Sequence, residues 1–287
     1  MIKEIIDKLV ALLAVSALLA SCSESELWQN PQTEARDGYI MLNFKTEIPA
    51  MQEVVTRAVD PDGGGVQDMT LFCFDSYGLF ISTVKAGVTV QKPGPGEMEG
   101  TFKAEVPENT RTIHFLANQN MDEFKEDSFR NKSESEVMAV LEGSSGRMIY
   151  WGRFACDAGN DSNIAEQMAT SGNSVKLIRN HARISVDNPD NNGHIVITGF
   201  AVCNTNAFGT VAPHHPKKGF DFTWPSSDDP FVTLPVNDAK MSDITDVTSS
   251  MNQYVFECEN SADAPVSVIL RGHLPDQDEE KYYRVLL

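Results

Sequence analysis

Alternation of apolar and polar residues recurs along most of this chain and constrains its fold more than any other feature. Ile40, Leu42 and Phe44 occupy every second position of the stretch 38–46, which places their side chains on one face of a β-strand. Further strand patterns cover residues 69–74, 78–84, 100–106, 112–117, 175–186, 194–203, 253–258, 266–270 and 282–287. Because helical patterns are few, the sequence predicts an all-β fold with minor α content, built from antiparallel β-sandwiches.

Turn and helix signals lie between these strand patterns. Asp75-Ser-Tyr-Gly78 has the composition of a hairpin turn. Ser133, followed three residues later by Glu136, predicts a capping box that opens a short helix. A second short helix is expected within residues 162–170.

The order of these patterns divides the chain in two. The second helical segment ends near Gly172, and a new series of strands follows it. We therefore expect two tandem β-sandwich domains, over residues 38–172 and 173–287. Residues 205–250 are rich in Pro, Gly, Asp and Ser, a composition that predicts long surface loops in the second domain.

The N-terminal region carries an apolar run that ends in Leu19-Ala20-Ser21-Cys22. The run is too short to span a bilayer, so residues 1–21 are expected to be a secretory signal peptide. A Cys directly after Leu-Ala-Ser resembles the bacterial lipobox, in which the thiol receives a diacylglyceryl group. We expect Cys22 to be lipidated and residues 22–37 to form a polar tether to the membrane. The alternative is an ordinary signal peptide with an incidental cysteine.

Charge and cysteine usage limit the partners of the chain. Its formal net charge is −18, a field that repels phosphate backbones and disfavours nucleic-acid binding. Four cysteines follow Cys22 without CxxC or metal-ligand spacing; they are Cys73, Cys156, Cys203 and Cys258. Export would allow disulfides, but Cys73 and Cys203 lie in apolar strand patterns that suit buried thiols. Both alternatives remain open at this point.

Signals for catalysis or metal binding are weak. His214-His215 lies in a loop context and would need a third ligand from elsewhere. Carboxylates and glycines over residues 60–68 form an incomplete calcium-loop pattern, because Gly64 and Leu71 stand where ligands are needed. The sequence contains no G-x-S-x-G, HExxH or P-loop motif. We therefore expect no catalytic residue, no metal and no cofactor.

Two exposed segments suggest interactions with other molecules. Arg57-Ala58 lies in a polar stretch after the first strand, where proteases commonly cut. Loss of a first strand would leave unpaired backbone beside an apolar groove, which a strand from another chain can fill. Alternatively, Arg57 is one exposed arginine among many. Phe220, Phe222 and Trp224 could instead form an aromatic platform for glycans or host proteins, or simply pack beneath a loop.

Several motifs resemble those of the fimbrillins, the lipoprotein-derived subunits of type V pili of anaerobic Gram-negative bacteria. In chain order they are the lipobox, the Arg57-Ala58 loop, Leu71–Gly78, Phe102–Pro107, Thr112–Asn118, Met148–Gly152, Val175–Val186 and Asn204–Pro213. Each motif is degenerate, and their shared order over most of the chain carries the resemblance.

This resemblance implies two transthyretin-like β-sandwich domains, export to the outer membrane as a lipoprotein, and a surface fimbrium as the final location. It implies cleavage by an Arg-specific protease at Arg57–Ala58, removal of the strand at 38–46, and assembly by donor-strand exchange. Partners would be other pilin subunits, the outer membrane before maturation, and host or bacterial surface ligands. The side chains that fill the groove before cleavage would be Ile40, Leu42 and Phe44.

One departure concerns the end of the sequence. The chain stops at Tyr282-Tyr283-Arg-Val-Leu-Leu287, inside a strand pattern, whereas fimbrillins continue to further strands, including a donor. We expect either a truncated chain or a subunit that donates no strand. A role at the shaft, tip or anchor of a fimbrium is left open.

Overall fold

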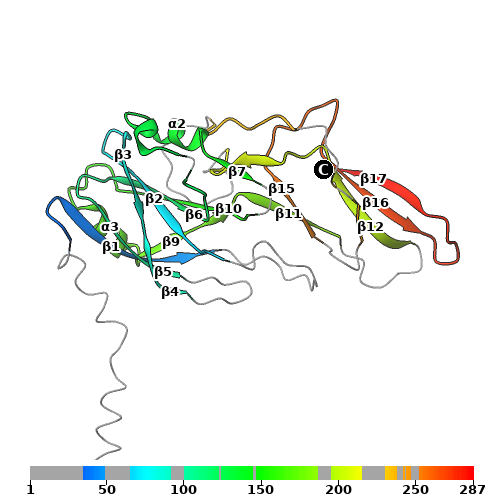
Figure 1. The fold of residues 1–287 in the computed structure, drawn as a ribbon, viewed down its shortest axis with the longest axis horizontal. Coiled ribbons are helices and arrows are strands. Elements are labelled where there is room, and N and C mark those ends of the chain that lie inside the picture. Colours follow the sequence, from blue (N-terminus) through cyan, green and yellow to red (C-terminus); the bar gives the residue numbers. More distant parts are fainter. Residues whose placement is uncertain are drawn as a thin grey trace, which may run out of the picture.

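The structure is a computed structural model. It describes residues 35–48, 65–91, 100–122, 124–144, 147–186, 195–214, 230–237, 242, 244–246 and 252–287. These residues form β-strands in several sheets, most of them antiparallel, with two short α-helices. The predicted all-β fold with minor α content is confirmed. The two halves of the chain lie end to end along the long axis of the molecule (Figure 1).

Two sheets face each other in the first half of the chain. The first sheet has the strand order β4 (Gly87–Gln91), β5 (Gly100–Pro107), β1 (Tyr39–Glu47), β9 (Ser174–Lys176). The second has the order β10 (Ile178–Arg179), β8 (Tyr150–Ala155), β6 (Thr112–Ala117), β2 (Met69–Phe74), β3 (Phe80–Lys85). A continuous apolar core between the sheets includes Phe44, Leu71, Phe102, Phe115 and Tyr150. Strands β2 and β6 occupy the ranges that the sequence predicted.

The second sheet is buried on both faces, which explains why β2 and β6 are buried at every position. Its outer face is covered by the 3₁₀ turn η3 (Glu126–Phe129) and by α2 (Glu134–Ala139). Ser133 caps α2 through the predicted capping box. The other helix, α3 (Ile164–Thr170), contributes Ile164 and Met168 to the core between the sheets.

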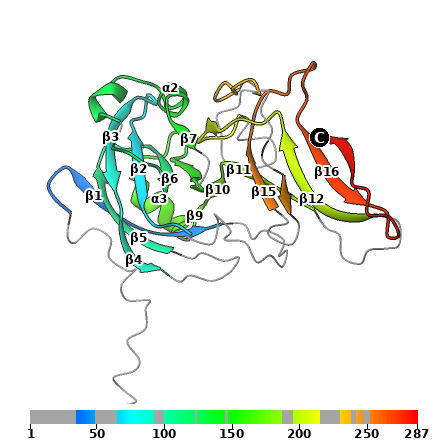
Figure 2. The ribbon, with the colours of Figure 1, turned by 45° about the vertical axis from the view of Figure 1, so that its right-hand side comes forward.

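The second half contains two further sheets among its described residues (Figure 2). One pairs β11 (His181–Ser185) with β15 (Asn252–Phe256), and the other has the order β14 (Thr245–Asp246), β12 (Val196–Cys203), β16 (Ser267–His273), β17 (Lys281–Leu286). Phe200, Val202 and Val268 lie in the core of this half. Strand β17 forms one edge and exposes Tyr282 and Leu286.

The single strand predicted over residues 175–186 was wrong, because the structure divides this run into β9, β10 and β11. Strand β9 pairs with β1, β10 with β8, and β11 with β15. The chain changes partners at Asn180, whose amide oxygen accepts a hydrogen bond from the backbone N–H of Ile149 at 3.1 Å. The domain division between residues 172 and 173 stays a prediction, although β9 and β10 pair with strands of the first half.

Within the stretch 205–250, for which surface loops were predicted, several of the described residues are buried, so the prediction needs correction there. Strand β13 (Phe208–Thr210) pairs with β7 (Glu142–Ser144) and joins the two halves. Four apolar residues of this region complete the cover on the second sheet; they are Val211, Ala212, Phe231 and Val232. Short apolar pairs within a stretch rich in Pro and Gly therefore make the contact between the halves.

The four cysteines beyond Cys22 are free thiols in the structure. Of the two alternatives left open by the sequence, the structure therefore has thiols and not disulfides. Cys73 is buried in β2, and its burial raises the pKa of the thiol to about 12. Among the described residues, the helices are too short or too polar to cross a membrane.

Candidate functional site

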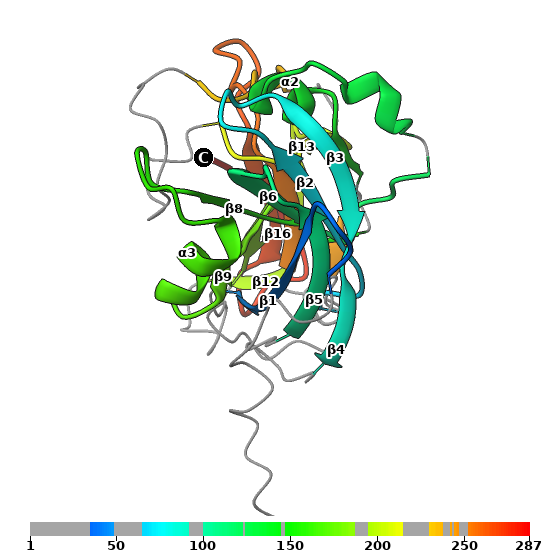
Figure 3. The same cartoon turned by 90° about the vertical axis from the view of Figure 1, so that its left-hand side faces the viewer.

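Strand β1 occupies an interior place in the first sheet, between β5 and β9 (Figure 3). It pairs antiparallel with β5 over residues 39–46 and parallel with β9 at its C-terminal end. The structure shifts the predicted strand by one residue, from 38–46 to Tyr39–Glu47. Loss of β1 would therefore open the sheet from within and leave the backbone of β5 without a partner on one side.

The apolar side chains of β1 point into the core, as their alternation predicted. Ile40, Leu42 and Phe44 expose 7%, 2% and 0% of their surface, and Ile48 beyond the strand exposes 7%. Full burial of such a side chain contributes about 1.5–3 kcal/mol. The four together contribute about 6–12 kcal/mol by the same scale, which is as large as the net stability of a typical domain.

Aromatic contacts surround Phe44. Its ring stacks on Phe102 with a centroid separation of 5.5 Å and an interplanar angle of 17°. Its other contact is an edge-on approach to Phe115 at 5.0 Å. Such offset and edge-on pairs add to the free energy of burial, so Phe44 is the residue that fixes β1 in the core most firmly.

Polar contacts hold both ends of β1. At the start, the backbone N–H and the guanidinium of Arg36 donate to the Glu105 carboxylate at 2.7 Å each. These bonds lower the pKa of Glu105, the backbone hydrogen bond first. At the end, the N–H of Leu177 donates to the carbonyl of Glu47 at 2.8 Å. The strand is thus held by polar contacts at its ends and by apolar burial along its length.

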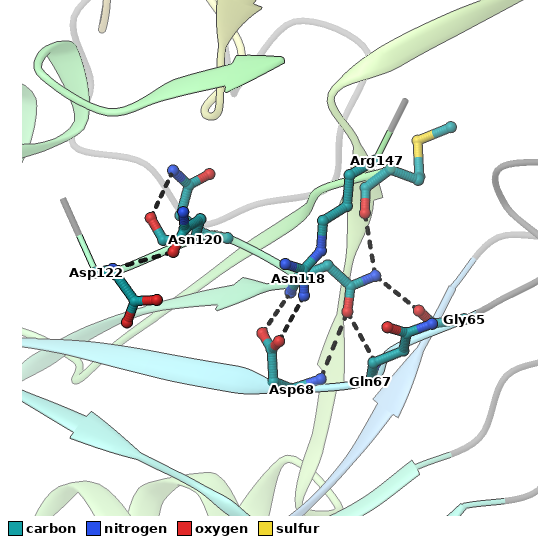
Figure 4. A network of polar contacts seen from close by, with 9 residues as sticks. Gly65, Gln67, Asp68, Asn118, Asn120, Asp122 and Arg147 are labelled. Atoms are coloured by element: carbon teal, nitrogen blue, oxygen red, sulfur yellow. Dashed lines mark hydrogen bonds and ion pairs between the residues drawn. The ribbon is translucent and has the colours of Figure 1, made fainter. Parts of the chain in front are cut away.

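A separate polar network holds the chain where it returns to the fold before β2 (Figure 4). The Asn118 amide donates to the carbonyls of Gly65 at 2.7 Å and Met148 at 3.0 Å, and accepts from the N–H of Gln67 at 2.8 Å. The backbone of Asn118 has a φ of 65°, a conformation that Asn tolerates better than most residues. These hydrogen bonds of Asn118 to residues 65–67 do not involve β1, although Val66 also packs in the core that the β1 side chains fill.

The carboxylate of Asp68 completes this network. It accepts from the N–H of Asn118 at 3.0 Å and from the guanidinium of Arg147 at 2.6 Å. The predicted scissile bond, Arg57–Ala58, lies between the two anchored ends but outside the described residues, as does Cys22. After a break in the chain between residues 48 and 65, the hydrogen bonds of Asn118 and Asp68 would still hold residues 65–68, because none of them involves β1.

The remaining sequence candidates do not form a site in the described residues. The His214 imidazole bonds the carbonyl of Val232 at 2.6 Å and so has a structural role. No group of three or more His, Cys, Asp or Glu suited to a metal is found in the part of the chain that the structure describes. Other candidates lie outside that part; they are His215, residues 60–64, Phe220, Phe222 and Trp224.

A buried polar cluster that the sequence analysis missed lies on the outer face of the second sheet. The Trp151 indole N–H donates to Nδ1 of His114 at 3.0 Å, and Nε2 of His114 donates to Glu134 at 2.7 Å. Arg153 donates to the same carboxylate at 2.6 and 3.1 Å. Phe231 stacks on the imidazole at 5.8 Å. The only sequence feature that pointed to this cluster was a single His within the apolar run 112–117, and its distance in sequence from Glu134 gave no reason to pair the two residues.

The electrostatics of this cluster indicate a structural role. Burial lowers the pKa of His114 and keeps the imidazole neutral. Burial alone would raise the pKa of Glu134, but hydrogen bonds from His114 and Arg153 outweigh it and lower the pKa to about 2. Because His114 is fully buried, the cluster holds α2 and the second half against the sheet rather than meeting a substrate.

Comparisons with known proteins show a related fold. No family model and no curated protein matches the chain. A candidate cell adhesion protein from Parabacteroides distasonis is similar over 86% of this chain and 80% of its own, with a TM-score of 0.50 and 14% identity. The tip fimbrial protein Mfa3 from Porphyromonas gingivalis, with a C-terminal truncation, matches over 86% and 81% at a TM-score of 0.49 and 14% identity. A candidate cell adhesion protein from Bacteroides eggerthii matches over 90% and 81% at 0.44 and 13%. The first likeness shows a shared β fold.

Proposed function

We propose that this chain is a structural or accessory subunit of a cell-surface fimbrium and contributes to adhesion. The observation that carries the proposal is the interior place of β1, whose alternate side chains fill the core of the first half. A strand in this place leaves a ready acceptor for another strand when it is removed. The fold that the chain shares with a candidate cell adhesion protein supports a role at the cell surface.

The proposed maturation follows from the order of residues along the chain. Export as a lipoprotein at Cys22 brings the chain to the outer membrane, and cleavage after Arg57 separates β1 from the body. The contacts of Asn118 with residues 65–68 then keep the new N-terminal segment attached to the fold. A strand of a neighbouring pilin subunit fills the place of β1 and joins the two subunits.

The test is the intact mass and the N-terminal peptide of the mature protein taken from the cell surface. The proposal expects a start at Ala58 without lipid. A mature protein that begins at diacylated Cys22 would contradict strand removal and favour a lipid-anchored surface module that binds glycans or host proteins.

A matched pair of variants tests the cleavage site. Arg57→Ala should block both processing and assembly, whereas Arg130→Ala should leave both unchanged, because Arg130 is an exposed arginine that pairs with its neighbour Asp127. Processing of Arg57→Ala at the wild-type rate would contradict the assignment of this bond.

A further inference from the structure

The four inward side chains of β1 face four residues of β5 that differ in size. The register places Ile40 opposite Val106, Leu42 opposite Ala104, Phe44 opposite Phe102, and Thr46 opposite Gly100. We call the space between β5 and β9 that β1 fills the β1 groove. We call the parts of it filled by Leu42, Phe44 and Thr46 the leucine, aromatic and threonine slots.

The aromatic slot has flat walls. Phe102 stacks on one face of Phe44, and Phe115 approaches it edge-on. An aliphatic side chain in this slot would leave part of both rings without contact, and voids of this kind cost stability.

The leucine and threonine slots are limited by their neighbours. Ala104 faces Leu42, and both are almost completely buried. A ring at this position would overfill a packed core. At the threonine slot, Thr46 faces Gly100, and even a Cβ added to Gly100 would lie only 3.3 Å from the Thr46 hydroxyl oxygen. The hydroxyl of Thr46 accepts from the N–H of Gly100 at 3.4 Å, which suits a small hydroxyl residue.

The two neighbours of β1 also set the direction of an occupant. Antiparallel pairing with β5 runs the length of β1, while parallel pairing with β9 covers only residues 45–47. A strand in the opposite direction would lose the antiparallel ladder with β5 and would reverse the order of the slots.

We propose that the β1 groove selects its occupant by slot order. The partner is an extended peptide segment that runs in the direction of β1 and carries two aliphatic residues, an aromatic residue and a small hydroxyl residue at alternate positions. The outward positions carry little selectivity, since Met41 and Asn43 are only half-buried. This inference rests on the proposed function, which supplies the exchange of strands.

The test uses the full chain with a recognition sequence for a site-specific protease placed between residues 48 and 65. Cleavage leaves β1 seated in its groove but no longer joined to β2. Synthetic peptides with the sequence of residues 38–48 then compete for the groove, and mass spectrometry of the intact complex measures the fraction of β1 replaced.

Two peptides of matched length separate slot order from general hydrophobicity. The first combines Leu42→Phe with Phe44→Leu, which keeps the composition and exchanges two slots. It should compete at least about 30-fold more weakly than the wild-type peptide. The second combines Met41→Thr with Asn43→Ser and should compete within about threefold of wild type.

The outcomes distinguish this inference from the proposed function. Equal competition by the exchanged peptide would overturn selection by slot order while leaving strand exchange intact. Failure of the wild-type peptide to enter the groove would overturn both. If the peptides compete with the expected relative strengths but the cell-surface protein retains residues 38–57, the result would support selection by slot order and contradict the proposed maturation.

Discussion

The substitution Phe44→Ala tests directly whether β1 is an integral part of the core. The Phe44 ring is fully buried, and its aromatic neighbours Phe102 and Phe115 are held by their own strands, so the cavity left by the ring cannot close fully. Removal of a buried Phe side chain costs about 3–5 kcal/mol. For a protein of this size, a loss of about 4 kcal/mol lowers the melting temperature by about 8–16 °C.

Urea unfolding followed by tryptophan fluorescence measures this loss, because Trp151 lies in the same half of the molecule. Asn43→Ala is the matched control, since this neighbouring side chain points out of the core on the same strand and should change stability by less than about 0.5 kcal/mol. A Phe44→Ala loss below about 1 kcal/mol would refute the reasoning, because it would mean that β1 contributes little to the folded state.

Three further predictions concern other parts of the structure. Burial lowers the pKa of His181 to about 4 from 6.5. Between these two pH values the unfolded chain binds a proton at His181 and the folded chain does not, so the free energy of unfolding should decrease as the pH falls from about 6.5 to 4. An NMR titration midpoint of its imidazole above 6 would contradict this. Gly209→Ala should cost about 1–3 kcal/mol in urea unfolding, because the new Cβ would lie 2.6 Å from the Phe256 side chain. Gly87→Ala is the control and should cost far less, because the nearest atom to its new Cβ is 3.8 Å away. Equal costs for the two variants would argue against tight packing of Gly209 on Phe256. The Cys73 thiol should resist alkylation at pH 8 until urea is added, and peptide mapping that finds it modified in the native protein would disagree with its burial.

Strands whose two faces differ were the easiest to predict from the sequence. The alternation of Ile40, Leu42 and Phe44 located β1 to within one residue, and Ser133 with Glu136 located the start of α2. Strand β8 was missed as a strand, because both of its faces are buried and its sequence does not alternate. Gly152 in its middle was the available signal: a Cβ there would lie 2.5 Å from the carbonyl of Lys176, so the glycine permits close approach of another strand.

The contact between the two halves, made by β7, β13 and Phe256, could not be predicted, because its residues pack against partners that are distant in the sequence. Gly143 on β7 faces Gly209 on β13, and the Phe256 ring packs against both. Glycines in a stretch rich in turn formers normally indicate loops, so the same residues that predicted surface loops in fact form a packed joint. Phe231 is a similar case, since its partner His114 lies in a distant strand.

The candidate site shows the same limit more sharply. An alternating pattern places Ile40, Leu42 and Phe44 on one face of a strand, but the pattern is the same for an edge strand and for an interior one. Only the sheet order, with β1 between β5 and β9, shows that its removal would open the sheet rather than shorten it. The Asn118 amide donates to the carbonyls of Gly65 and Met148 without any contact to β1, so these hydrogen bonds would remain if β1 were removed. These two observations are the ones that support the proposed replacement of β1 by another strand.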